Sequence, residues 1–242
     1  MIKTIKTMSK QEKERYTVPR KVQDVIPVRR IWPDGIFLVG NKFSKTYKFS
    51  DINYLVASRE DKESMFLTYS ELLNSLDSGA VTKITINNRR MNQANFETSI
   101  LMPMQGDFRD EYRGEYNQML LDKATGANGI MQEKYITISV VKKDIEEARA
   151  YFSRVGADLI SHFAALGSKC VELDATERLR ILHDFYRQGE ESEFVFNARE
   201  MMKRGHSFKD YICPDGIEKN SDYLKLGGKF CRVLFLKDYA SY

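Results

Sequence analysis

Four residues in the C-terminal third of the chain, His183, His206, Cys213 and Cys231, are of the types that bind zinc or form a thiol nucleophile. Their spacing matches no zinc finger or ribbon. A Cys–His nucleophile pair drawn from them is equally open on spacing and equally unsupported. We therefore expect a surface histidine and buried thiols, and His162, beside Phe163 on an apolar helix face, is expected to be a half-buried histidine with satisfied hydrogen bonds.

A cluster of acidic residues could bind a cation or supply paired carboxylates for catalysis. Its members are Asp107, Asp110, Glu111 and Glu115. Arg109 and Arg113 lie between them, and acidic residues are favoured in the first turn of a helix. The pattern therefore indicates a solvated helix face, and we assign no catalytic or metal-binding residue to this chain.

Two short glycine-containing runs deserve comparison with phosphate-binding loops. Gly40-Asn41-Lys42 lacks the upstream glycine and the following hydroxyl residue, and Gly227-Gly228-Lys229 is followed by Phe230. Both are typical of hairpin turns. We assign no cofactor-binding residue, and we expect the chain as given not to hydrolyse ATP.

The positive charge of the chain is concentrated at its start. Residues 1–30 hold nine Lys or Arg against three acidic residues, a net of +6, while the whole chain carries +4, which leaves the remainder at −2. Residues 1–24 are predicted to form a basic flexible arm that could contact anionic lipid or DNA. Three cysteines are too few and too scattered for a disulfide framework, which favours a reducing, cytoplasmic setting. No apolar run approaches the roughly 18 residues of a membrane span.

The elements expected to position these residues alternate between strands and helices. The expected strands are a hairpin over 36–49 and runs at 51–57, 81–87, 135–141, 170–173 and 229–237. The expected helices cover 65–76, 107–128, 144–166 and 174–186. The order strand, helix, strand, helix occurs twice, over 51–128 and 134–188. This possible internal repeat predicts an α+β fold of ferredoxin-like type, with split strand-helix-strand units, an N-terminal hairpin and a C-terminal strand.

The helix over 107–128 is very polar but carries Tyr112, Tyr116, Met119 and Leu120. We expect these residues to pack on the chain's own sheet. The alternative is a contact surface for another domain.

The runs Ile26 to Ile31, Asp34 to Phe37 and Tyr47 to Tyr54 resemble the N-terminal portion of the conjugal-transfer ATPases of type IV secretion systems, the VirB-four-like family of Gram-positive mobile elements. The run from Lys229 to Tyr239 is similar to the strand that leads towards the rest of such proteins. The resemblance covers about 25–242 and rests on residues that shape the fold.

The resemblance implies that residues 25–242 are the N-terminal domain of a larger ATPase, whose absent RecA-like domain would hold ATP and Mg²⁺. No catalytic residue of the family can be placed on this sequence. The implied role is a non-catalytic assembly and docking domain for DNA transfer, cytoplasmic and peripheral at the inner face of the membrane. Its partners would be other subunits of the secretion apparatus or a second copy.

Two other functions stay open from the sequence. One is a free-standing nucleic-acid-binding module that uses the basic arm and a sheet face, although neither strand 135–141 nor run 229–236 carries the aromatic signature of an RNA-binding sheet. The other is a small enzyme with a thiol or metal site built from Cys213, Cys231 and His206.

Overall fold

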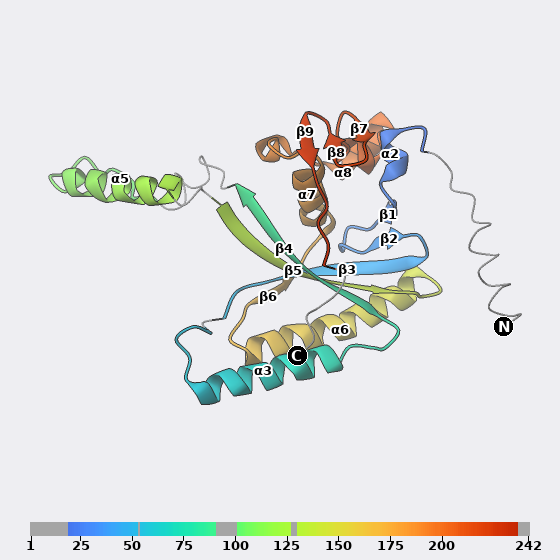
Figure 1. Cartoon of the computed structure of the whole chain (residues 1–242), viewed down its shortest axis with the longest axis horizontal. Helices are drawn as coiled ribbons and strands as arrows, with labels where there is room; N and C mark the ends of the chain where they lie inside the picture. Colours follow the sequence, from blue (N-terminus) through green and yellow to red (C-terminus); the bar gives the residue numbers. More distant parts are fainter. Residues whose placement is uncertain (1–18, 53, 91–100, 127–129, 237–242) are drawn as a thin grey trace, which may run out of the picture.

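The computed structural model describes residues 19–52, 54–90, 101–126 and 130–236 (Figure 1). Its main sheet is antiparallel throughout, with strand order β1-β2-β3-β5-β4, and β6 pairs with the last part of β3. The strands of this sheet are β1 (Val28–Ile31), β2 (Phe37–Val39), β3 (Lys42–Phe49), β4 (Val81–Arg90), β5 (Ile130–Val140) and β6 (Cys170–Glu172). The helices are α2 (Val22–Val25), α3 (Arg59–Asn74), α5 (Asp110–Gly126), α6 (Ile145–Ala165), α7 (Ala175–Tyr186) and α8 (Ala198–Arg204), with short 3₁₀ turns η1 (Glu191–Glu193) and η2 (Phe208–Tyr211).

The chain is therefore α+β, as the alternation of patterns predicted. Helix α3 connects β3 to β4, and α6 connects β5 to β6, while the four strands lie in the order β6-β3-β5-β4. Each helix thus joins two strands that have another strand between them. This is the arrangement of two interleaved, split strand-helix-strand units, and it is compatible with the ferredoxin-like architecture expected from the sequence.

Side-chain caps fix where the helices of these units begin. Ser58 accepts a hydrogen bond from the Asp61 amide at the start of α3, and Asp144 accepts one from the Glu147 amide at the start of α6. At α7 the Asp174 side chain and the Glu177 side chain form a reciprocal capping box. Such caps satisfy backbone N–H groups that the first helical turn leaves without partners.

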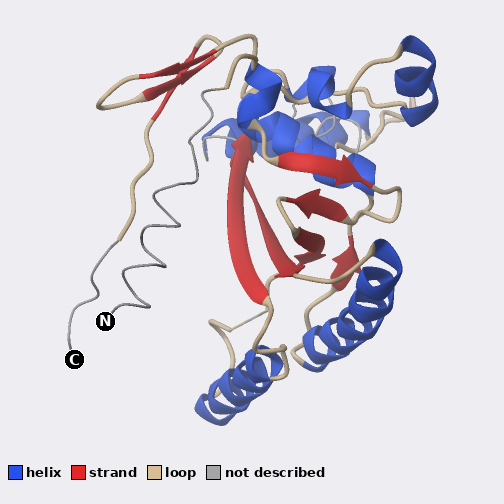
Figure 2. Ribbon diagram, turned by 90° about the vertical axis from the view of Figure 1, so that its right-hand side faces the viewer, coloured by secondary structure: helices blue, strands red, loops and turns tan. Residues whose placement is uncertain are grey.

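The first hydrophobic core lies between the sheet and helices α3 and α6. Tyr47 of β3 is fully buried there (0% exposed), and its hydroxyl donates to the backbone carbonyl of Phe152 on α6. Ile136 of β5 and Leu72 of α3 join the same cluster. Because both helices contribute to one core, they cover the same face of the sheet, as Figures 1 and 2 show.

A second core lies on the opposite face, between the β1–β2 end of the sheet and helix α7. Val28 and Phe37 pack there against Leu179 of α7 and Ile212, which follows η2. The turn between β1 and β2 is held close to the start of α7. Gly35 adopts φ 79°, and a Cβ at this position would lie 2.0 Å from the Leu173 carbonyl oxygen, so only glycine fits.

A small sheet of three short strands follows the second core. Its strands are β7 (Ile217–Lys219), β8 (Leu224–Leu226) and β9 (Lys229–Cys231), in that order and antiparallel. After β9, residues Arg232–Leu236 continue without strand pairing, and we call them the C-terminal segment. Figure 2 shows this segment leaving the small sheet and running apart from the body of the molecule.

Two sequence expectations are corrected by the structure, and a third is largely outside the described residues. The described residues of 51–57 form turns and not a strand, because the first split unit begins with β3. The C-terminal strand predicted over 229–237 is confirmed only as β9, because residues 232–236 have no neighbouring strand. Residues 1–18 of the arm predicted over 1–24 lie outside the described residues. The last residues of the arm belong to the short helix α2. The internal repeat over 51–128 and 134–188 stays a prediction.

Candidate interaction surface

Helix α5 forms a projection at one end of the molecule (Figure 1, green, left). In the sequence α5 lies between β4 and β5, and these two strands stay paired as far as Arg90 and Ile130. Strand β3 accompanies β5 only between Lys134 and Val140. The two-stranded ribbon therefore runs past the sheet and carries α5 away from both cores.

One side of α5 is held by the segment that precedes it. The Asn117 side chain accepts a hydrogen bond from the Met102 amide at 2.8 Å and donates to the Met102 carbonyl at 2.9 Å. Asn117 is the buried polar residue of this helix among the described side chains. Because both backbone groups of Met102 are satisfied by one side chain, the segment and the helix form a local unit.

The start of α5 is held by a cluster of charges. One Nη atom of Arg113 lies 2.5 Å from carboxylate oxygens of both Asp107 and Asp110. Asp110 also accepts hydrogen bonds from the amides of Gln105 and Gly106. Hydrogen bonds from Arg113 lower the pKa of Asp107, and bonds from the Gln105 amide and Arg113 lower that of Asp110. These two members of the acidic cluster thus lie at the start of the helix, where Arg113 and backbone amides stabilise their negative charge.

The opposite side of α5 presents an aromatic stripe to solvent. Phe108, just before the helix, is 82% exposed, and Tyr112, Tyr116 and Met119 on the helix are exposed as well. Spacings of four, four and three residues place them on one side, because a helix turns once in about 3.6 residues. Met102, Arg109 and Arg113 border a shallow hollow along the stripe with three of its members. We call Phe108, Tyr112, Tyr116 and Met119 the α5 stripe.

The position of the α5 stripe differs from the expected packing of this helix on the sheet, and the stripe contains a residue that was not predicted from the sequence. Tyr112, Tyr116 and Met119 do not pack on the chain's own sheet, because the ribbon holds α5 beyond it. Leu120, expected to join them, is half-buried. Phe108 and Met102 were not singled out from the sequence. The signal for Phe108 was available, since an aromatic residue at every fourth position, 108, 112 and 116, is a helical stripe.

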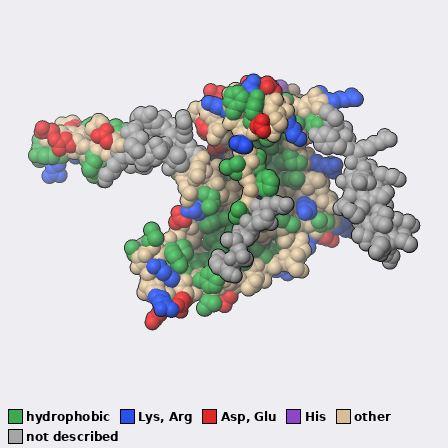
Figure 3. Space-filling view, in the orientation of Figure 1, with side chains coloured by type: hydrophobic (Ala, Val, Ile, Leu, Met, Phe, Trp, Pro, Cys, Tyr) green, Lys and Arg blue, Asp and Glu red, His purple; other side chains and the backbone are tan. Residues whose placement is uncertain are grey.

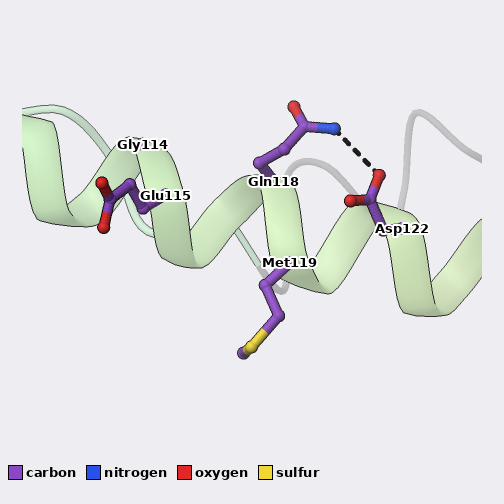
Figure 4. Close-up of a pocket in the computed structure, with 5 residues that line it drawn as sticks. All are labelled: Gly114, Glu115, Gln118, Met119 and Asp122. Carbon is purple, nitrogen blue, oxygen red and sulfur yellow. Dashed lines mark hydrogen bonds between the residues drawn. The ribbon is translucent and has the colours of Figure 1, made fainter.

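A second hollow on α5 is lined by residues of this one helix. Figure 4 shows the Gln118 amide donating a hydrogen bond to Asp122 at 2.9 Å on one side of the helix, while Met119 points to the other side and Glu115 stands apart from both. Side chains that diverge from a lone helix cannot enclose a substrate. This hollow is therefore an open surface beside the stripe.

The histidines and cysteines considered for zinc or thiol chemistry are not brought into one site. Among the described residues, no three His, Cys, Asp or Glu side chains are placed to hold a metal ion. Cys213 is buried in the second core, as expected, and burial raises the pKa of its thiol. Cys231, also expected to be buried, is instead half-exposed, because it lies in β9 of the small sheet. A raised pKa is the reverse of what a nucleophilic cysteine needs.

Each histidine has a structural environment of its own. His183 is buried with its ring centre 5.1 Å from that of Phe194. His206 lies on the surface, where Nδ1 is 3.6 Å from Asp210. His162 is half-buried and its Nδ1 lies 2.7 Å from the Asp158 carbonyl oxygen, as expected for a satisfied histidine.

The two glycine-containing runs are turns, as predicted. Gly40 has φ 60° between β2 and β3, and Gly227 has φ 55° between β8 and β9. On the sheet face that Tyr135 of β5 shares with Lys48 of β3, the Lys48 ammonium pairs with Glu133 at 2.6 Å, and the Tyr135 hydroxyl donates to the same carboxylate. The positive charge of Lys48 is thereby matched within the chain.

Within the part of the chain that the structure describes, no helix has the length and apolar character needed to cross a membrane. The sequence matches no known protein-family model. It also matches no curated protein.

Proposed function

We propose that this chain is the non-catalytic N-terminal assembly and docking domain of a conjugative-transfer, type IV secretion ATPase. It contacts other subunits of the apparatus or the membrane channel, at the cytoplasmic, inner face of the membrane. The family assignment comes from the sequence resemblance alone. ATP and Mg²⁺ belong to the domain that the resemblance implies elsewhere in the parent protein.

The α5 stripe is the observation that carries a docking role. Large apolar side chains are exposed together on one helix side, whereas the other side is fixed by Asn117 and Met102. Exposed apolar groups bordered by polar residues are typical of protein contact sites. The stripe stands on a ribbon clear of both cores, so a partner can reach it without displacing any described element.

The residues that carry the resemblance have fold-shaping positions, which suits a domain without chemistry. Ile36 belongs to the first core and Phe37 to the second. Asp34, in the turn before them, accepts a hydrogen bond from Arg149 of α6 at 2.8 Å. The Asp34 to Phe37 run thus ties together the layers on both faces of the sheet.

The size of the native gene product tests the parent-protein part of the proposal. An antibody raised against this domain should detect, in source cells, a band far above 28.1 kDa, and the downstream reading frame should encode a phosphate-binding loop. A band at 28.1 kDa would contradict the proposal and favour the nucleic-acid-binding module.

The docking part is tested by substituting the stripe in the intact transfer system. The double variant Phe108→Ser/Tyr112→Ser should lower transfer frequency by about tenfold or more and weaken the two-hybrid signal with an apparatus subunit, at unchanged protein level. The matched control is Phe66→Ser/Leu67→Ser, which removes two exposed apolar side chains from α3. Equal losses in both variants, or no loss in either, would count against a docking role for α5.

A further inference from the structure

Strand β4 leaves a long unpaired edge on the main sheet. It is the last strand in the order β1-β2-β3-β5-β4, and β5 is its strand partner among the described residues. Val81–Arg90 contains no proline, and its exposed side chains include the apolar Val81, Ile84 and Ile86 as well as Lys83, the one charged residue before Arg89. Edge strands of this length normally carry a feature that blocks further pairing, because their free N–H and C=O groups can accept another strand.

The hydrophobic layer beneath the sheet stops short of this edge. Ile84 is in register with Ile136 of β5, so the two side chains lie on the same face. Ile136 is 1% exposed beneath the helices, whereas Ile84 is 44% exposed and Ile86 is more exposed still. An added strand beside β4 would cover these side chains and continue the core by one strand.

The C-terminal segment is an apolar run that lacks a sheet to pair with. Val233, Leu234, Phe235 and Leu236 are consecutive, large and apolar, and Leu234 is 84% exposed. A short continuous apolar run of this kind is typical of a strand buried on both faces. In the described structure these residues have no strand partner.

The two unpaired elements face the same side of the molecule but are not aligned. Figure 1 shows the C-terminal segment (dark red) crossing the line of β4 at a steep angle, and Figure 2 shows it standing off from the sheet. Figure 3 shows hydrophobic side chains gathered on the face that the segment crosses. Pairing requires a strand that runs alongside β4. The segment of a separate copy can align with β4, because its direction is not fixed by the chain that carries this edge.

We propose that the C-terminal segment of a second copy of this chain pairs with the free edge of β4. Each copy offers the β4 edge and one C-terminal segment, so two copies can exchange segments reciprocally. A reciprocal exchange forms a closed, two-fold symmetric dimer and satisfies both edges at once. The backbone hydrogen bonds provide affinity, and burial of Leu234, Phe235, Ile84 and Ile86 provides the apolar contribution. This inference does not depend on the proposed function.

The oligomeric state of the 242-residue chain is the first test, measured by sedimentation and by light scattering after gel filtration. We expect a dimer whose dissociation constant rises about tenfold or more in Leu234→Asp/Phe235→Asp and in Ile86→Lys. These side chains are exposed in the single chain, so the variants should fold, which circular dichroism checks. The matched control Phe108→Asp/Tyr112→Asp on α5 should dimerise like the unmodified chain. A monomer at all concentrations, or a dimer insensitive to the segment variant, would overturn the proposal.

Cross-linking between two differently sized chains identifies which segment occupies the edge. One chain carries Leu234→Cys and the other Ile84→Cys, both with Cys231→Ser, and a short bismaleimide joins the pair. We expect the mixed covalent dimer only when both cysteines are present. When both are placed in one chain, a cross-link confined to the monomer would show that the segment folds back on its own β4, and this too would overturn the proposal.

Discussion

One Nη atom of Arg178 donates a hydrogen bond to the backbone carbonyl of Ser44 at 2.7 Å, and the other Nη atom donates to the Ser44 hydroxyl at 3.1 Å. The first Nη atom also donates to the Gly35 carbonyl at 2.7 Å. The guanidinium lies 4.0 Å from the centre of the Phe37 ring. Arg178 therefore fastens α7 to the β2–β3 hairpin. Burial lowers the pKa of Arg178 to about 9, so the guanidinium keeps its charge at neutral pH.

Substitution of Arg178 should lower the free energy of unfolding. Arg178→Met removes three hydrogen bonds and leaves two carbonyl groups without this donor, at a cost of about 2–4 kcal/mol. Arg178→Lys should recover only part of the loss, because an ammonium cannot reproduce the forked geometry. Urea unfolding measures both, with the exposed neighbour Arg180→Lys as the control. Equal midpoints for the Arg178→Met and control variants would contradict this role.

Gly156 is a second position where the packing dictates the residue. A Cβ on Gly156 of α6 would lie 2.6 Å from a Glu172 carboxylate oxygen and 2.9 Å from the Tyr47 hydroxyl. Glu172 is paired with the Lys45 ammonium and Tyr47 is fully buried, so neither yields freely. Gly156→Ala should therefore destabilise the fold by about 1–3 kcal/mol, despite the better helix propensity of alanine.

The matched control for that prediction lies on α5. At Gly114 a Cβ would meet only the flexible end of Met104, at 3.7 Å. Gly114→Ala should therefore keep or raise helix stability, by up to about 1 kcal/mol. Thermal unfolding followed by far-ultraviolet circular dichroism compares the two variants, and a destabilising Gly114→Ala or a stabilising Gly156→Ala would contradict the packing argument.

Helices with strong hydrophobic periodicity were predictable from the sequence, but the position of α5 relative to the sheet was not. The buried face of α6 was predicted because Phe152, Val155 and Leu159 recur at helical spacing. Helix α5 was predicted as well, but its position was not. Whether a half-polar helix packs on a sheet depends on how far the β4–β5 ribbon extends beyond β3, and the pairing register decides that.

A metal or thiol site and the contacts of Arg178 also differ in how much the sequence says about them. Spacing alone argued against a shared site for Cys213, Cys231 and His206, because such sites need close, recurrent intervals. The Arg178 contacts could not be foreseen, since they join Gly35 and Ser44 to a helix more than a hundred residues away, as separations of 143 and 134 residues show. Long-range side-chain contacts to backbone carbonyls leave no periodic trace in a sequence.

Alkaline pH should destabilise the fold through its buried acids. Burial, reinforced by the charge of Glu172, raises the pKa of the Cys170 thiol to about 11 and also raises that of Tyr47. An unfolded chain ionises its cysteines near about 8.5 and its tyrosines near about 10. Above these values the two groups hold fewer protons in the unfolded chain than in the folded chain, so their contribution to the free energy of unfolding falls as pH rises. The lowered pKa of Arg178 acts in the opposite direction, because this guanidinium loses its proton more readily in the folded chain than in the unfolded one.

The expected window for Cys170 lies between about pH 8.5 and its folded pKa of about 11. Urea unfolding at several pH values across this window should show the contribution of Cys170 as the difference in pH slope between the unmodified chain and Cys170→Ala, since Arg178 acts equally in both. Cys170→Ala removes one of the two groups and should make the slope less negative, although the variant begins from lower stability. An unchanged pH slope in Cys170→Ala would show that this thiol is ionised equally in both states.

The two sides of α5 should respond differently to substitution. Phe108→Ser/Tyr112→Ser removes exposed side chains and should leave the unfolding midpoint unchanged. Asn117→Ala removes both hydrogen bonds to Met102 and leaves its amide and carbonyl without that partner, so α5 should open more often. Amide hydrogen exchange should therefore quicken about tenfold across α5 in Asn117→Ala while exchange in α6 stays constant. Faster exchange in the stripe variant instead would mean that Phe108 and Tyr112 stabilise the projection, and their exposure would then not mark a docking surface.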